Sequence, residues 1–167
     1  MNNHAADTLS NAELVERYMP MVYRIAYTRV QNVPDAEDIT QEVFLKYLRA
    51  DKMFEDEEHR KLWLIRVTVN TIKSMLTSAW KRHNTMTLEE IPEPAYMEPE
   101  AFGLKEQVEK LPEKYRIPMF LYYYEEFSVK DIAHALQFSE GTVKSLLSRG
   151  REKLRSILKE ESECLKT

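Results

Sequence analysis

The 167-residue sequence is poor in glycine and cysteine. Its three glycines are Gly103, Gly141 and Gly150. Phosphate-cradling loops and most tight hairpins need glycine at positive φ, so both are disfavoured. The single cysteine, Cys164, excludes an internal disulfide and a cysteine cluster for zinc. The four histidines are far apart and show no paired ligand spacing, so we expect neither a metal site nor a cofactor.

Long apolar runs and a secretory signal are also missing. No stretch approaches the roughly 20 apolar residues that a membrane span requires. The N-terminus lacks a basic segment followed by an apolar run. We therefore expect a cytoplasmic protein that does not insert into a membrane. The hydrophobic content of 43% is ordinary for a folded chain, and the scarcity of glycine favours an all-α fold.

Positive charge is not in excess, because the net charge is −4. Residues 1–83 carry 12 basic and 12 acidic side chains, and residues 104–167 carry 12 and 11. Residues 84–103 carry five glutamates, three prolines and no lysine or arginine. This segment is expected to be an acidic linker between two small helical domains, 1–83 and 104–167, rather than a long loop within one domain.

Hydrophobic periodicity predicts three or four helices in residues 1–83, at about 12–30, 34–50 and 62–82, with a charged loop at 51–61. The second domain should have helices at about 104–110, 113–126, 129–136 and 141–159. The S-x-x-D pattern from Ser128 to Asp131 is a capping signal for the third of these. A short capped helix, a tight turn at 137–140 and a basic helix together indicate a helix-turn-helix.

Three helices carry a face that a small domain does not need for its own core. In 34–50, Phe44, Leu45 and Leu48 lie opposite the core stripe, beside Asp38 and Glu42. An apolar patch at that place indicates either a docking surface or a neighbouring helix. The other two faces are polar. One is formed by Arg66, Asn70, Lys73 and Thr77, with Ser74 and Lys81 adjoining and Trp63 at the border. The other is formed by Lys144, Ser145, Ser148, Arg149, Arg151 and Arg155.

Both polar faces suit nucleic acid, although each is also compatible with a solvated surface. Cations and amides beside an aromatic ring fit single-stranded nucleic acid, whose phosphates and unstacked bases they can bind. On the last helix, small hydroxyl residues allow close approach to a major groove, and lysine and arginine reach base edges or phosphates. Residues 139–159 hold six basic and two acidic side chains, so the positive charge is concentrated there.

Three segments in register resemble the extracytoplasmic-function (ECF) sigma factors, the small two-domain group of bacterial sigma factors. They are DAEDITQEVFLKYL at 35–48, WLIRVTVNTIKSML at 63–76 and SVKDIAHALQFSEGTVKSLLSRGREKLRSIL at 128–158. The resemblance covers about residues 14–82 and 104–158, nearly the whole chain except the tails and the linker. It implies a non-enzymatic factor that directs core RNA polymerase to promoter DNA, helps to melt it and starts transcription.

The resemblance implies a role for each unusual face. Segment 35–48 is similar to the part that docks on the clamp helices of the polymerase large subunit. This implies six polymerase-binding residues: Asp38, Gln41, Glu42, Phe44, Leu45 and Leu48. Segment 63–76 and its preceding loop are similar to the part that captures the single-stranded minus-ten element. With the polar face above, this gives seven minus-ten contacts: Phe54, Trp63, Arg66, Asn70, Lys73, Ser74 and Thr77.

The last helix is similar to the family's reader of the duplex minus-thirty-five element. This implies six contacts: Thr142, Lys144, Ser145, Ser148, Arg149 and Arg151. In such proteins the acidic linker occupies the basic RNA path of the polymerase. A membrane-associated anti-sigma protein is a further partner that the resemblance implies.

Four features depart from the family pattern. The loop at 54–58 is unusually acidic, and Ser74 and Met75 stand near a position that is often aspartate. Glu126 occupies a place commonly held by glycine at a helix end, where a positive φ would cost glutamate about 1 kcal/mol. Pro118 lies inside a predicted helix and should either kink it or mark its start.

Three other functions compete with this one. An autonomous helix-turn-helix regulator that binds operator DNA would explain residues 104–158. It gives no role to the patch of Phe44, Leu45 and Leu48 or to the face that contains Asn70. A small helical enzyme is disfavoured because no nucleophile–base pair, metal set or phosphate loop stands out. An adaptor that binds polymerase but not DNA would be tested by reversing the charge of Lys144 and Arg149.

Overall fold

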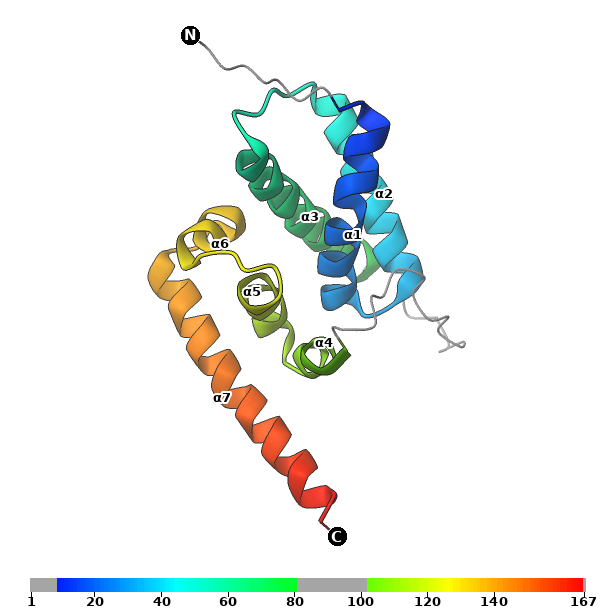
Figure 1. Ribbon diagram of the computed structural model, residues 1–167. Helices are drawn as coiled ribbons and strands as arrows, with labels where there is room; N and C mark the ends of the chain where they lie inside the picture. Colours follow the sequence, from blue (N-terminus) through cyan, green and yellow to red (C-terminus); the bar gives the residue numbers. More distant parts are fainter. Residues whose placement is uncertain (1–8, 81–101, 167) are drawn as a thin grey trace.

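The computed structural model describes residues 9–80 and 102–166, and within these ranges its regular structure is helical (Figure 1). The expected all-α fold class is therefore confirmed. Seven helices are described, in this order: α1 (Asn11–Val30), α2 (Val33–Ala50), α3 (Glu57–Trp80), α4 (Phe102–Glu109), α5 (Glu113–Tyr123), α6 (Val129–Leu136) and α7 (Glu140–Cys164).

The first two helices begin at caps that the sequence supplies. At α1, the Ser10 hydroxyl accepts from the backbone N–H of Glu13 at 3.3 Å, and the Glu13 carboxylate accepts from the Ser10 N–H at 2.7 Å. This capping box satisfies two of the N–H groups that have no partner within the helix. At α2, the Asn32 side-chain oxygen accepts from the Asp35 N–H at 2.9 Å. Both helices therefore start within one residue of their predicted positions.

Helix α3 starts five residues earlier than predicted, because its acidic first turn looked like loop in the sequence. The Asp56 carboxylate accepts from the backbone N–H of His59 at 2.7 Å and caps the helix. Glu57 and Glu58 then stand in the first turn, where negative charge is favourable near the helix N-terminus. Charge alone therefore did not distinguish a loop from the start of a helix.

Helices α1, α2 and α3 pack against one another around an apolar core (Figure 1). The apolar stripe of α1 is buried along its length, and Val22 and Ile25 have no exposed surface. In α2, Ile39 and Val43 face the same core, while α3 supplies Leu64. Burial of these faces stabilises the helices far more than intrinsic propensity does.

The C-terminal half corrects two expectations about α5. The helix begins at Glu113 with Pro118 inside it, so Pro118 does not mark its start. It ends at Tyr123, three residues before the predicted end. The chain then turns through Glu126, whose φ of 59° lies in the left-handed region. The Phe127 N–H donates to the Leu121 carbonyl at 3.0 Å and closes this turn.

The predicted helix-turn-helix is formed by α6 and α7. The Ser128 hydroxyl accepts from the Asp131 N–H at 3.1 Å, and the Ser139 hydroxyl accepts from the Thr142 N–H at 3.1 Å. Helix α7 runs five residues beyond its predicted end, to Cys164. Near this end Ile157 packs against the core, whereas its neighbour Leu158 is 45% exposed.

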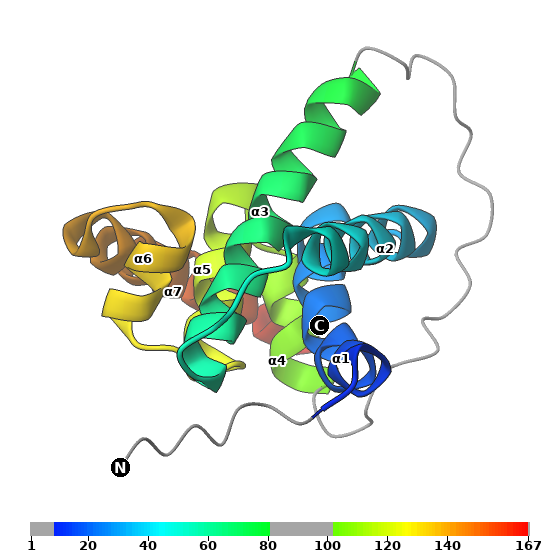
Figure 2. The same cartoon turned by 90° about the horizontal axis from the view of Figure 1, so that it is seen from above.

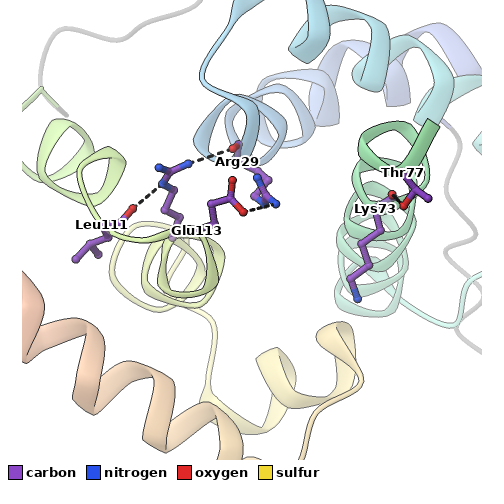
Figure 3. Close-up of polar contacts among 6 residues, drawn as sticks. Arg29, Lys73, Thr77, Leu111 and Glu113 are labelled. Carbon is purple, nitrogen blue, oxygen red and sulfur yellow. Dashed lines mark hydrogen bonds and ion pairs between the residues drawn. The ribbon is translucent and has the colours of Figure 1, made fainter. Parts of the chain in front are cut away.

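The two halves lie against each other, with α5 beside α1 and α6 beside α3 (Figures 1 and 2). Arg24 of α1 forms an ion pair with Glu125 at 2.9 Å. Arg29 forms another with Glu113 at 2.9 Å, which Figure 3 shows together with its surroundings. The predicted linker lies outside the described residues except for positions 102 and 103, which already belong to α4.

Candidate functional site

A groove with a volume of about 510 Å³ runs between α1 and α2, at the apolar patch predicted on α2. Leu45 and Leu48 line it and are 40% and 47% exposed. Phe44 also lines the groove but is only 6% exposed. Of the two alternatives that the sequence left open, cover by a neighbouring helix therefore applies to Phe44, whereas Leu45 and Leu48 remain exposed.

The opposite wall of the groove comes from α1, which the pattern on α2 alone did not indicate. Val15, Met19 and Tyr23 line it, together with Pro20. Val15 and Met19 are four residues apart and only half-buried, beside the stripe that fills the core. This second stripe on α1 is the pattern that could have predicted the wall.

The polar rim of the groove continues onto α3. Asp38 and Gln41 are exposed and line both the groove and a neighbouring hollow, which extends to Ser74. Lys46 lines the same hollow. Its ammonium lies 3.8 Å from the Glu42 carboxylate and donates to the Thr71 hydroxyl at 3.0 Å. The predicted polymerase-docking residues and part of the predicted minus-ten face therefore form one continuous surface.

Phe54 lies in a cluster of aromatic rings rather than alone on a loop. Its ring stacks on Tyr47 with 6.0 Å between centroids, and Trp63 meets it edge-on at 5.6 Å. Two cations adjoin the same ring: the Arg60 guanidinium at 5.2 Å and the Lys52 ammonium at 5.7 Å. Residues 55–58, which follow Phe54, carry four acidic side chains against these two cations.

The polar face of α3 is open in its second half. Asn70, Lys73, Ser74 and Thr77 are all exposed. The Thr77 hydroxyl donates to the Lys73 backbone carbonyl at 2.8 Å, as Figure 3 shows, so it is engaged within the helix. Lys81, which was expected to adjoin this face, lies outside the described residues.

Arg66, at the other end of this face, contacts the C-terminal half. Its guanidinium donates to the His134 backbone carbonyl at 2.7 Å, and the same nitrogen lies 3.3 Å from the ring nitrogen Nδ1 of His134. No spacing in the sequence could indicate this contact, because the two residues are 68 positions apart. The predicted minus-ten residues are therefore not equally accessible.

The basic face of α7 lies on the outside of the helix-turn-helix. Lys144, Ser145, Ser148 and Arg149 are exposed, as the sequence predicted. The remaining two predicted contacts take part in internal bonds. Thr142 exchanges a hydroxyl–hydroxyl bond of 2.9 Å with the capping Ser139. Arg151 is half-buried and donates to the Tyr123 hydroxyl at 3.1 Å.

Neither a metal site nor a membrane span is evident among the described residues. No group of three or more histidine, cysteine or acidic side chains gathers there at a distance suited to a metal ion. No helix in the same part of the chain combines the length and the apolar character needed to cross a bilayer.

Two family models match the chain in the order of its two halves. The model described as Sigma-70 region 2 matches residues 14–82, and the model described as Sigma-70, region 4 matches residues 102–154. The first match covers α1 to α3, and the second runs from α4 into α7. These matches define the class as a two-region factor of the sigma-70 type.

Solved structures share the fold. The sigma factor RpoE from Bartonella quintana, in complex with the anti-sigma factor NepR, matches with a TM-score of 0.69 at 22% identity. That match covers 89% of this chain and 96% of RpoE. CnrH, in complex with the cytosolic domain of CnrY, matches with a TM-score of 0.63 at 18% identity, over 93% of this chain and 92% of CnrH.

Sequence relatives identify the group. The ECF RNA polymerase sigma factor SigW of Bacillus subtilis is 29% identical over 167 residues, covering 89% of each chain. The RNA polymerase sigma-H factor of Pseudomonas aeruginosa is 30% identical over 162 residues, covering 87% of this chain and 84% of that one. The chain belongs to the ECF sigma factors of RNA polymerase. Its function is to direct transcription initiation by RNA polymerase.

Proposed function

We propose that the three surfaces divide promoter recognition between them, while core RNA polymerase supplies the chemistry and this protein has no enzymatic activity of its own. The domain formed by residues 1–83 docks on polymerase and captures the melted minus-ten strand. The domain formed by residues 104–167 binds the duplex minus-thirty-five element, and the acidic linker 84–103 lies in the RNA path of the polymerase. The protein works in the cytoplasm, where a membrane-associated anti-sigma protein holds it inactive.

The observation that carries this proposal is the exposed apolar groove between α1 and α2. Leu45 and Leu48 expose 40% and 47% of their surface at its wall, with Phe44 beneath them. Exposed leucines that line a hollow mark an interaction site for another protein. A partner helix that buries both side chains would gain on the order of 25 cal/mol for each Å² of apolar surface removed from water. The clamp helices of the polymerase large subunit are the proposed partner.

The minus-ten function is supported by the continuity between this groove and the polar face of α3. Ser74 lines the same hollow as Asp38 and Gln41, and Asn70 and Lys73 are exposed nearby on α3. Amide and hydroxyl groups can hydrogen-bond the edges of an extruded base, and the ammonium can bind its phosphate. Capture of unstacked bases would offset the few kcal/mol that unstacking and unpairing cost.

Phe54 takes a different role from the one the resemblance implies for it. Because its ring packs on Tyr47 and Trp63, it anchors the loop that approaches the strand. Lys52 lies against both Phe54 and Trp63, at 5.7 and 6.0 Å. Its ammonium is a further group at the proposed strand-binding surface that is able to meet a phosphate.

Run-off transcription with purified core polymerase and a library of promoter fragments tests the function. We expect transcripts that start at defined positions only when the protein is present, and specific duplex binding in gel shift only together with core polymerase. Specific operator binding by the isolated chain, without polymerase, would support the autonomous regulator instead. Failure to direct initiation on any fragment would overturn the proposal.

A pair of substitutions tests the groove itself. Leu48→Glu places a charge in the groove and should reduce the affinity for core polymerase at least tenfold. Leu158→Glu is the matched control, because Leu158 is 45% exposed but lies on α7, outside the groove. Equal polymerase affinity for the two variants would show that the groove is not the docking site.

A further inference from the structure

The end of α5 carries two exposed tyrosines that have no part in the proposed function. Tyr122 and Tyr123 are 37% and 39% exposed, and their rings meet edge-on with 4.9 Å between centroids. Tyr123 is the last residue of α5, and its hydroxyl accepts a hydrogen bond of 3.1 Å from Nη1 of Arg151 on α7. Within the described part of the chain, Arg151 is bonded to the second tyrosine and not to the first.

Close packing of α5 beside α7 brings Tyr123 to this position (Figure 1). Met119 and Tyr123 are four residues apart, so they lie on the same side of α5. Met119 packs at Gly150, where an added Cβ would stand only 2.8 Å from the methionine sulfur. Arg151 directly follows Gly150 in the sequence. The close approach of the two helices therefore brings the Arg151 guanidinium within reach of the phenol that lies one turn beyond Met119.

Arg151 belongs to the side of α7 that is proposed to bind duplex DNA. Lys144, Ser148 and Arg151 are spaced by four and three residues, which places them on one side of the helix, here called the reading side. Lys144 and Ser148 are exposed, whereas Arg151 is half-buried. Tyr123 therefore adjoins the reading side of α7, although it comes from another helix.

The hydrogen bond leaves the Arg151 guanidinium able to bind a phosphate. A guanidinium has several N–H donors, and the bond to Tyr123 comes from only one of its nitrogens. The other donors suffice for a bidentate contact with a phosphate, which is a favourable geometry for arginine. Fixing a side chain with many rotamers during binding lowers an affinity by about two- to tenfold. A bond that holds Arg151 in place before binding removes part of this loss.

We infer that Tyr123 is a positioning residue for duplex binding. Its hydroxyl holds the guanidinium of Arg151 at the edge of the reading side, where the guanidinium binds a phosphate of the minus-thirty-five element. The inference rests on the proposed function, because it requires that α7 binds duplex DNA. It adds a residue of α5 to an interface whose other proposed residues all lie on α7.

Phenylalanine substitutions at the two neighbouring tyrosines test this role. Tyr123→Phe removes the hydroxyl and keeps the ring. The affinity of the polymerase holoenzyme for the upstream duplex of a promoter fragment selected by run-off transcription, measured by fluorescence anisotropy, should fall about three- to tenfold. Tyr122→Phe is the matched control, because it removes a hydroxyl of similar exposure that is not bonded to Arg151, and it should leave the affinity unchanged. Equal affinities of the two variants would overturn the inference.

A double-mutant cycle shows whether the hydroxyl acts through Arg151. Arg151→Ala should weaken duplex binding at least as much as Tyr123→Phe, and adding Tyr123→Phe to Arg151→Ala should have no further effect. If Tyr123→Phe lowers the affinity by the same factor with and without Arg151, the inference is wrong.

The salt dependence of the affinity distinguishes positioning from a purely structural role. The slope of log affinity against log salt should become less steep by about 0.9 for Arg151→Ala, and by part of that amount for Tyr123→Phe. A role confined to stability would lower the urea midpoint of Tyr123→Phe and leave the slope unchanged, which would count against the inference.

NMR relaxation of the arginine Nε–H groups measures the positioning in the isolated chain, without polymerase or DNA. The Nε–H of Arg151 should be ordered in the unmodified protein and in Tyr122→Phe, and mobile in Tyr123→Phe. A mobile Arg151 in the unmodified protein would overturn the inference.

Reversing the charge of Lys144 and Arg149 separates the inference from the proposed function. If this reversal weakens duplex binding but Tyr123→Phe does not, the inference is wrong and the proposed function stands. If Tyr123 orders Arg151 but neither the reversal nor Arg151→Ala weakens duplex binding, the proposed function is wrong and the inference fails with it.

Discussion

Gly150 of α7 lies directly against Met119 of α5. A Cβ atom at Gly150 would stand 2.8 Å from Met119 Sδ and 2.9 Å from Met119 Cγ, and Met119 has no exposed surface. The absence of a side chain at Gly150 therefore leaves room for Met119 where α5 packs against α7. Gly141, in the first turn of the same helix, has only Ser139 Oγ nearby, at 3.9 Å.

Alanine substitutions at the two glycines, one crowded and one open, measure how much the close contact with Met119 restricts residue 150. Replacing glycine by alanine in a helix interior gains up to about 1 kcal/mol of helix propensity. At Gly150 the added methyl group must displace a fully buried side chain, and such overpacking costs about 1–3 kcal/mol. We expect Gly150→Ala to be less stable than Gly141→Ala by about 1–3 kcal/mol in urea unfolding. Equal stability of the two variants would show that Met119 moves aside without cost.

At Glu126 we expect a substitution to increase the stability of the protein, because the backbone there is strained. A φ of 59° disfavours any side chain, whereas glycine adopts it freely. We expect Glu126→Gly to stabilise the protein by about 0.5–1 kcal/mol, measured as an upward shift of the unfolding midpoint. As a control, Glu140→Gly at the start of α7 has no positive φ to relieve and should not stabilise the protein. A destabilised Glu126→Gly variant would contradict this expectation.

Tyr18 should make the protein sensitive to alkaline pH. Burial and the 3.0 Å hydrogen bond from its hydroxyl to Glu57 raise its pKa from 10.0 to about 12. The folded state thus keeps the proton that the unfolded state loses above pH 10. The stability linked to Tyr18 is therefore fully present below pH 10 and is lost as the pH rises to about 12.

The measurement is urea unfolding at pH 9 and pH 11. Linkage gives a loss of about 1 kcal/mol from Tyr18 at pH 11, which the Tyr18→Phe variant should not show. Tyr23, whose pKa burial also raises to about 12, keeps its own contribution in that variant. An unchanged pH dependence in Tyr18→Phe would show that its hydroxyl does not titrate in this range.

The basic face of α7 should determine binding to duplex DNA. Reversing Lys144 and Arg149 to glutamate should weaken binding of polymerase holoenzyme to minus-thirty-five duplex by at least tenfold. Each lost phosphate contact should also reduce the salt dependence by about 0.9 in the slope of log affinity against log salt. Lys159→Glu, further along the same helix, serves as the control for charge alone. Unaltered affinity in the double variant would support an adaptor that does not read DNA.

Periodicity and capping patterns predicted the helices closely where the local signal was strong. The bounds of α6, 129–136, agree with the prediction. Ser128 and Asp131 form the capping pattern at its start, and its buried residues end at Leu136. The predicted start of α3 was wrong, because Glu57 and Glu58 are compatible with either a loop or the first turn of a helix. The pattern of polar residues also predicted the exposed face of α7, because residues three and four positions apart lie on the same side of a helix.

The packing of the two halves against each other could not be predicted from such patterns. The contact between Arg66 and His134, and the one between Arg24 and Glu125, join residues 68 and 101 positions apart. No local rule fixes which of several exposed arginines meets which acceptor in another domain. The same holds for Phe44, because its position on α2 left open whether a neighbouring helix covers its side chain.

The sequence by itself determined the helical fold, the basic reading helix and the membership of the sigma factors, because each depends on residue type and spacing along the chain. Only the tertiary structure decided which predicted contacts are accessible. Burial of Phe44, the bond from Arg151 to Tyr123, and the position of Arg66 against α6 all depend on how the helices pack. Packing is a property of surfaces meeting in space, and spacing along one helix does not specify it.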